Sequence, residues 1–306
     1  MAEAIWSMIA AEAASPAQEA VDAIKLSRPR TRQMKVIYIA GTSHSGSTLL
    51  DLMLNAHPQI VSVGEVVNLH RHLTYKNSKK KTYRPCSCGA PSLWACEFWS
   101  GVNERMQQTV GKSLLELNRL DHGSSSTPDA ALFAAIAKVS GRDFIVDSSK
   151  LPSRLARLMR NPELEVYPIH LVRNPSGQIY SMTKKYGGFL KHIVHYEYVH
   201  DQIHRTLRSV PHCVVHYENL VLQPEQTLSR VLAPLGLEFD PSQLSWAEQV
   251  KHTVAGNRMR RQQESELVLD EKWKHSLTRI QQSMINIGTL RSKRALPKAA
   301  SVPEEG

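Results

Sequence analysis

The sequence predicts an α/β protein with a central parallel sheet of about five strands flanked by helices. Short runs of β-branched and apolar residues alternate with longer helical patterns along the chain, as parallel β-α-β connections require. The first of these runs is followed directly by a small-residue turn and an apolar helix, which is the arrangement of a phosphate-binding loop. The 306 residues have room for one large α/β domain or two small ones.

The first strand is expected at residues 36–40, which read Val-Ile-Tyr-Ile-Ala, the composition of a strand buried on both faces. A turn of glycine, serine and threonine with one histidine follows at 41–46, and Ser47 and Thr48 then lead into a strongly apolar helix. We expect this helix to end before Pro58, because proline disfavours helical geometry in the residue that precedes it.

The same alternation continues through the rest of the chain. A polar, basic and cysteine-bearing stretch at 74–92 is expected to form an excursion loop. The further strands are expected at 60–63, 144–146, 166–172 and 214–215, and helices at 99–120, 128–139, 176–185, 189–208 and 224–235.

The chain is expected to have three segments. Residues 1–33 are rich in alanine and then basic, with two prolines, and indicate weak helices and a linker. Residues 34–290 form the folded domain, and residues 291–306 are expected to be a disordered tail.

The net charge of +10 suits nucleic acid, a membrane surface or an anionic small ligand. The chain has no low-complexity basic arm and no zinc-finger or RNA-binding signature, so we expect an anionic nucleotide rather than nucleic acid. A merely solvated basic surface is the alternative. No apolar run approaches ~20 residues, so no transmembrane segment is expected. The N-terminus carries Glu3 and Glu12 and lacks a basic n-region, which favours a cytoplasmic protein.

Three of the four cysteines, Cys86, Cys88 and Cys96, lie close together in the sequence, and the fourth is Cys213. A disulfide, a partial zinc site and free thiols all fit this spacing. A complete zinc site needs a fourth ligand, and the neighbouring sequence offers no obvious one, so we expect no bound metal.

The polar residues that follow the strands are expected to meet at one edge of the sheet. In a parallel sheet of this kind, ligands bind beyond the carboxyl ends of the strands. The segments that fall there are the loop 41–48, Glu65, residues 147–150, Arg173 and Tyr217.

The loop from Gly41 to Thr48 is similar to the nucleotide-binding pattern G-x-x-x-x-G-K-[ST], but Ser47 stands where that pattern has lysine. Without this cation the loop suits an anion but not ordinary ATP or GTP chemistry. A P-loop kinase or NTPase is therefore the rival enzyme class, and a small-residue turn without a ligand is the structural alternative.

With these segments in order, residues 35–290 resemble the sulfotransferases that use 3′-phosphoadenosine 5′-phosphosulfate (PAPS). The resemblance implies that the loop binds the 5′-phosphosulfate, and that Arg173 and Ser181 bind the 3′-phosphate. The segment 217–220 resembles the family's Tyr-Glu-Asp-Leu, and 256–258 resembles a later nucleotide-contacting loop. The donor-binding residues it implies are Gly41, Ser43, His44, Ser45, Gly46, Ser47, Thr48, Arg173, Ser181, Tyr217, Gly256, Asn257 and Arg258.

Residues 49–65 look most like the tyrosylprotein sulfotransferase subgroup and related bacterial enzymes. In that subgroup the glutamate after the second strand is the catalytic base, which implies this role for Glu65. Lys150 resembles the subgroup's lysine near the transferred group. Each has a plain alternative, as an ordinary carboxylate at a strand end or a solvated loop lysine. His44 departs from the family, which usually has lysine or arginine there; it is expected to act as a hydrogen-bond donor or to become cationic.

The expected reaction is in-line transfer of a sulfuryl group to an acceptor hydroxyl or amine, with no metal required. Glu65 would accept the acceptor proton, while His44, Lys150 and the loop amides stabilise charge. A nucleotide-binding pseudoenzyme is the non-enzyme alternative. The acceptor class stays open between a small molecule, a sugar, a peptide and a lipid. Histidines that line an acceptor pocket, or only one polar helix face, are expected at His192, His195, His200 and His204.

Overall fold

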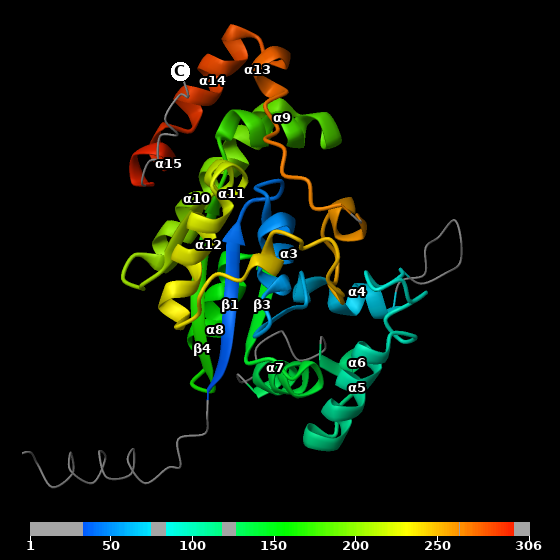
Figure 1. Ribbon diagram of the computed structural model, residues 1–306. Helices are drawn as coiled ribbons and strands as arrows, with labels where there is room; N and C mark the ends of the chain where they lie inside the picture. The colour runs from blue at the N-terminus through cyan, green and yellow to red at the C-terminus, as the bar shows by residue number, and fades with distance from the viewer. Residues whose placement is uncertain (1–32, 75–83, 118–126, 263, 297–306) are drawn as a thin grey trace, which may run out of the picture. The chain divides into compact units, whose positions relative to one another are not determined.

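The computed structural model describes residues 33–74, 84–117, 127–262 and 264–296 (Figure 1). The predicted N-terminal segment 1–33 lies outside these residues except for Gln33. Within the described part of the chain, no helix is both long and apolar enough to cross a membrane.

A five-stranded sheet with the order β2-β3-β1-β4-β5 lies at the centre of the domain (Figure 1). All four strand pairs are parallel, which confirms the predicted α/β class. The strands are β1 (Met34–Gly41), β2 (Ile60–Ser62), β3 (Phe144–Lys150), β4 (Leu164–Val172) and β5 (Cys213–His216).

Strand β1 is the middle strand and is covered on both faces. Its residue Val36 pairs with Ile145 of β3 and with Val166 of β4. Because side chains alternate along a strand, Val36 and its i+2 neighbours face one hydrophobic cluster while Ile37 and Ile39 face the other. The predicted burial of this strand on both faces is therefore confirmed.

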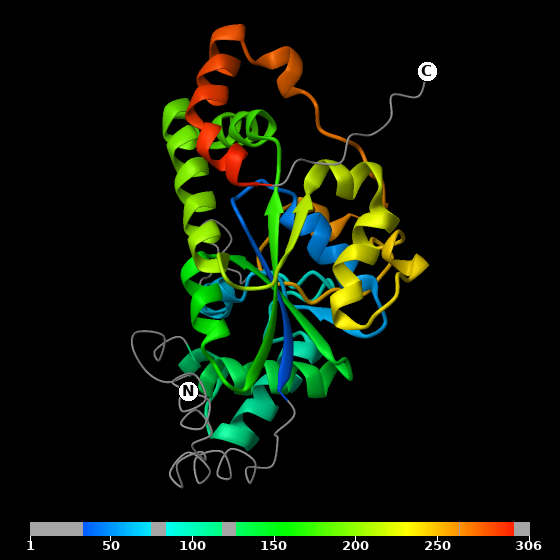
Figure 2. The ribbon, with the colours of Figure 1, turned by 90° about the vertical axis from the view of Figure 1, so that its left-hand side faces the viewer.

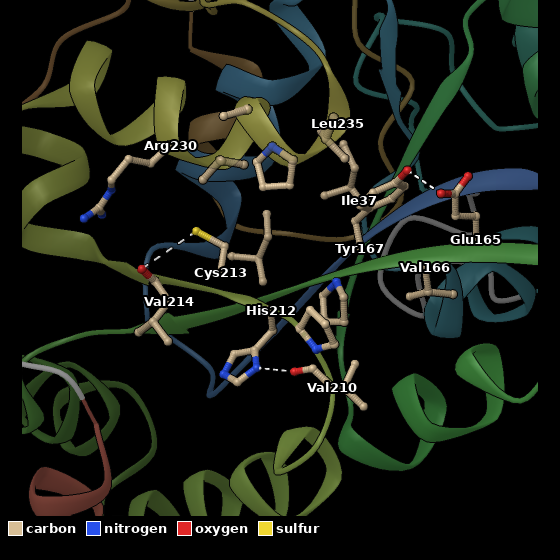
Figure 3. Close-up of a pocket in the computed structure, with 16 residues that line it drawn as sticks. Ile37, Glu165, Val166, Tyr167, Val210, His212, Cys213, Val214, Arg230 and Leu235 are labelled. Carbon is tan, nitrogen blue, oxygen red and sulfur yellow. Dashed lines mark hydrogen bonds between the residues drawn. The ribbon is translucent and has the colours of Figure 1, made fainter.

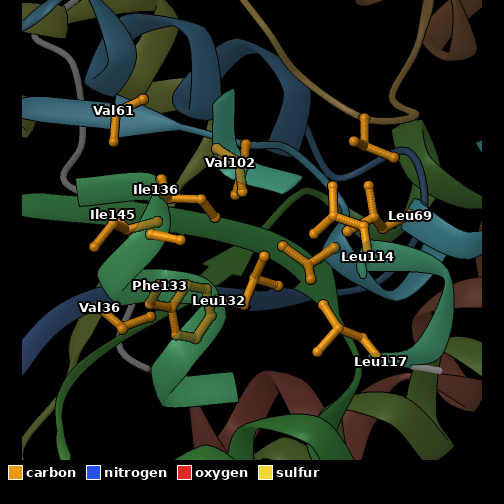
Figure 4. Close-up of a cluster of buried hydrophobic side chains, with 14 of the residues drawn as sticks. Val36, Val61, Leu69, Val102, Leu114, Leu117, Leu132, Phe133, Ile136 and Ile145 are labelled. Carbon is orange, nitrogen blue, oxygen red and sulfur yellow. The ribbon is translucent and has the colours of Figure 1, made fainter. Parts of the chain in front are cut away.

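Helices α3 (Ser47–Ala56), α11 (Tyr217–Leu222) and α12 (Pro224–Leu232) contribute to the cluster around Ile37. Figure 2 shows α10 on one side of the sheet and α3 with α12 on the other. The cluster around Val36, drawn in Figure 4, is completed by α5 (Glu97–Val110), α7 (Thr127–Ser140), α8 (Pro152–Met159) and α10 (Phe189–Leu207).

Shorter elements connect these layers or lie beyond them. They are η1 (Val66–Asn68), α4 (Leu69–Thr74), α6 (Leu114–Leu117), α9 (Pro175–Tyr186), η3 (Ala233–Leu235), η4 (Pro241–Gln243), η5 (Arg258–Arg261), α13 (Trp273–Ser276), α14 (Arg279–Gly288) and α15 (Leu290–Ala295).

Two predicted elements differ from the structure. The helix expected at 99–120 ends at Val110, because Gly111 adopts a left-handed conformation with φ of 66° and caps it; α6 then begins at Leu114. The tail expected to be disordered from residue 291 is helical as far as Ala295, within α15. Residues 118–120 and 297–306 lie outside the described residues.

Candidate functional site

The predicted site segments follow the carboxyl ends of all five strands. The loop 42–46 follows β1, Glu65 lies three residues after β2, and Lys150 ends β3. Arg173 follows β4 and Tyr217 follows β5. This edge is where open parallel sheets bind their ligands.

The loop between β1 and α3 depends on one glycine. Gly46 has φ of 93°, in the left-handed region, and its carbonyl accepts hydrogen bonds from the amides of Leu49 and Leu50 at 3.0 and 3.2 Å. A side chain at position 46 would begin 2.4 Å from a ring carbon of Tyr217. Only glycine therefore allows the loop to lie this close to Tyr217 and still enter α3, whose positive dipole end favours an anion.

Backbone strain is concentrated at this edge of the sheet. Among the described residues, the non-glycine residues with positive φ are His44 (65°), Lys150 (70°) and Ala255 (59°). Such conformations cost about 1–3 kcal/mol each and are typical of functional sites. Two of the three, His44 and Lys150, are residues for which the family resemblance implies a catalytic role.

His44 is held in the loop by a contact with α9. Its Nδ1 lies 2.7 Å from the hydroxyl oxygen of Ser181 on α9. Burial, followed by the charges of Lys185 and Arg173, lowers the pKa of His44 to about 4. The role of His44, as a hydrogen-bond donor or as a cation, stays a prediction.

Arg173 is held beside the loop by several contacts. Its side chain is 8% exposed, and its Nη1 donates to the carbonyl oxygen of His44 at 3.1 Å. Its guanidinium carbon lies 4.6 Å from the centre of the Tyr217 ring. Its Nη2 forms an ion pair with Asp270 at 3.0 Å. Nothing in the sequence pattern indicated Asp270, which comes from a distant segment.

Glu65 and Lys150 form an ion pair. The Nζ of Lys150 lies 2.5 Å from Oε1 of Glu65, and the side-chain amide of Asn68 donates to Oε2 at 2.8 Å. The backbone amide of Glu65 donates to the carbonyl of Val254 at 2.8 Å. The two side chains are 20% and 13% exposed, so the pair remains accessible from solvent.

A second carboxyl group, that of Asp51, lies buried near this pair and was missed by the sequence analysis. Burial raises its pKa to about 7, although hydrogen bonds with Ser62 and Ser148 and the charge of Lys150 oppose the shift. Asp51 lies within the apolar run of α3, where a single carboxylate gives no periodic signal.

The segment after Val254 approaches the start of α3. The backbone amide of Asn257 donates to the hydroxyl of Thr48 at 3.3 Å, and a side chain at Gly256 would begin 3.4 Å from the same hydroxyl. The side chain of Asn257 accepts from the amide of Met259 and caps η5. Arg258 is exposed in that turn. The two serines of the loop differ in exposure. Ser43 is exposed, whereas Ser45 is fully buried.

The four histidines of α10 do not form one pocket. His192 contacts the carbonyl oxygen of Gly187 at 2.8 Å, and His200 lies 2.8 Å from His170, both inside the protein. His195 and His204 are exposed. The helix therefore presents them to different surroundings.

A pocket of about 850 Å³ lies apart from all of these residues (Figure 3). It is lined by the first half of β4, the start of β5 and residues 230–235, mostly with apolar side chains. It contains none of the predicted site residues and lies toward the amino ends of the strands, so it is not the candidate site.

Comparisons with known proteins test the family and the fold. A family model described as "Sulfotransferase family" matches residues 37–241. The sulfotransferase domain of the Synechococcus PCC 7002 olefin synthase is 20% identical with a TM-score of 0.54, over 89% of this chain and 98% of that chain. A sulfotransferase domain from the curacin biosynthetic pathway is 18% identical with a TM-score of 0.50, over 84% and 98%.

A search of curated protein sequences finds no match. At these identities the two solved structures show a shared fold, while the family model covers more than half of the chain, including the loop, Glu65, Lys150, Arg173, Ser181 and Tyr217. The chain therefore belongs to the sulfotransferase family.

Proposed function

We propose that the protein transfers a sulfuryl group from PAPS to an acceptor hydroxyl or amine. The observation that carries this proposal is the contact between the two segments to which we assign the anionic ends of the donor. His44 of the loop lies 2.7 Å from Ser181, and its carbonyl accepts from Arg173 at 3.1 Å. A donor with a phosphosulfate at one end and a 3′-phosphate at the other needs two such adjacent positions.

The two positions differ in chemistry, as the two ends of PAPS do. The loop offers backbone amides at the start of α3, which suit the 5′-phosphosulfate. Arg173 offers a planar guanidinium, which suits the 3′-phosphate. On this proposal the phosphate takes over the position at the guanidinium that the Asp270 carboxylate now fills.

Glu65 acts as the general base in this proposal. Its carboxylate, which forms an ion pair with Lys150, can accept a proton from the acceptor. As the acceptor oxygen or nitrogen forms its bond to sulfur, the bond from sulfur to the phosphate oxygen breaks, and adenosine 3′,5′-bisphosphate leaves. Lys150 and His44 donate hydrogen bonds to the oxygens on which negative charge develops.

The buried carboxylate of β3 weighs against a P-loop kinase or NTPase. Such an enzyme requires an acidic residue that holds magnesium after a strand. Asp147 is fully buried and instead pairs with Arg154 at 2.7 Å, and it also accepts from the Ser149 amide at 3.0 Å. Its oxygens are thus used within the protein.

The proposal is tested by transfer of labelled sulfate from PAPS into acceptors that represent phenols, sugars, tyrosine peptides and lipids. We expect label in at least one class, together with release of adenosine 3′,5′-bisphosphate in equal amount. Donor binding without transfer to any acceptor would support the non-catalytic alternative. Label transferred from ATP rather than PAPS would support the kinase.

A further inference from the structure

Three cysteines and one histidine form a cluster outside the candidate active site. The Sγ atoms of Cys88 and Cys96 lie 3.6 Å apart, and Nδ1 of His252 lies 3.2 Å from Sγ of Cys96. Together with Cys86, the four ligand atoms all lie within 4.8 Å of one another. The sequence offered no fourth ligand near the cysteines, because His252 follows Cys96 by 156 residues.

The distances fit a tetrahedral metal site better than a disulfide. Zinc lies about 2.3 Å from sulfur and about 2.0–2.1 Å from nitrogen, so tetrahedral ligands are separated by roughly 3.8 Å for two sulfurs and roughly 3.5 Å for sulfur and nitrogen. A disulfide requires about 2.05 Å between sulfurs, and all the cysteines are free. Three thiolates and an imidazole are a ligand set that selects zinc.

Local structure holds these ligands in place. The amide of Cys86 donates to the carbonyl of Ala90 at 2.9 Å, and Gly89 has φ of 99°, so the chain reverses tightly and keeps the first two sulfurs together. The ring of His252 stacks on Phe98 with centroids 4.6 Å apart and planes 10° apart. The indole of Trp99 donates to the His252 carbonyl at 2.8 Å. These two contacts hold His252 in position beside the cysteines.

We propose that Cys86, Cys88, Cys96 and His252 bind one structural zinc ion. Four protein ligands complete the tetrahedron and leave no open position, so the ion takes no part in the chemistry. Its function is to join two segments that are remote in the sequence.

This junction lies next to the proposed base. The hydroxyl of Ser87 donates to the carbonyl of Lys251, and accepts from the amide of Thr253, each at 2.8 Å. The next residue, Val254, accepts from the amide of Glu65 and donates to the carbonyl of Val63, again at 2.8 Å. A zinc ion at His252 therefore stabilises the backbone that positions Glu65.

The proposal is tested by metal analysis of the full chain. The protein is expressed in zinc-containing medium and purified without chelators. We expect about one zinc ion per chain. The variants Cys96→Ser and His252→Ala should lose this zinc. The matched controls Cys213→Ser and His212→Ala, which change the same residue types outside the cluster, should retain it.

A second measurement does not depend on whether the variants fold. The wild-type protein is reconstituted with cobalt(II) after zinc removal, and we expect a sulfur-to-cobalt charge-transfer band that zinc abolishes. Wild-type protein without zinc, an intact mass lower by the two hydrogens of a disulfide, or full zinc content in both cluster variants would each overturn the proposal.

Discussion

Replacing Arg173 with alanine should weaken the binding of PAPS through the loss of its 3′-phosphate contact. The guanidinium is 8% exposed, so a phosphate bound to it is little screened by water. Loss of such a charged hydrogen bond costs about 1.5–3 kcal/mol. When PAPS binds the wild type, its phosphate must displace the Asp270 carboxylate from Arg173. Because Asp270 is 37% exposed, this ion pair contributes at most about 1 kcal/mol. We therefore expect the lower half of this range, about 1.5–2.2 kcal/mol, which is an increase in Kd of about 10- to 40-fold.

The assay is calorimetric titration with two ligands, PAPS and adenosine 5′-phosphosulfate, which lacks the 3′-phosphate. Because Arg173 also contacts the carbonyl of His44, the substitution could disturb the loop itself. The second ligand separates the two effects, since it should bind the variant and the wild type equally well. Unchanged PAPS binding, or an equal loss for both ligands, would refute the assignment of the 3′-phosphate to Arg173.

Three further predictions concern the loop and the buried histidines. His44→Ala should lower kcat more than donor affinity, while His44→Arg should retain or raise activity; unchanged turnover in the alanine variant would remove His44 from the mechanism. Gly46→Ala should destabilise the fold by about 1–3 kcal/mol in urea unfolding, because its methyl group would meet Tyr217 and its φ is positive. Burial lowers the pKa values of His72 and His200 to about 4, so the stability they contribute is complete above pH 6.5 and is lost as pH falls toward 4. The wild type should therefore lose more unfolding free energy between pH 7.5 and 5 than His72→Phe does, and an equal loss in both proteins would contradict this.

The sequence predicts the sheet and its functional edge well, because both depend on local patterns. An uninterrupted apolar run indicated β1, and a turn of small residues with Gly46 at its end indicated the approach to α3. Arg173 and Glu65 could be placed at one edge without coordinates, since each lies within three residues of the end of a strand in a parallel sheet.

The features that were missed depend on contacts between distant segments. His252 completes the cysteine cluster, and Asp270 pairs with Arg173, yet neither lies in a recognisable motif. The low pKa of His44 arises from burial and from the charges of Lys185 and Arg173, which are both remote from His44 in the sequence. Such effects arise from packing between distant segments, so local sequence patterns do not reveal them.

The most direct test of the account is single-turnover transfer by Glu65→Gln with saturating PAPS. Glutamine keeps the shape of the side chain and its contact with Asn68 but cannot accept a proton. A matched control, Glu104→Gln, removes an exposed carboxylate of α5. We expect donor binding near the wild-type value and turnover lower by about 10²–10⁴-fold for Glu65→Gln, with no change in the control. Turnover within a few-fold of wild type would contradict the assignment of Glu65 as the base.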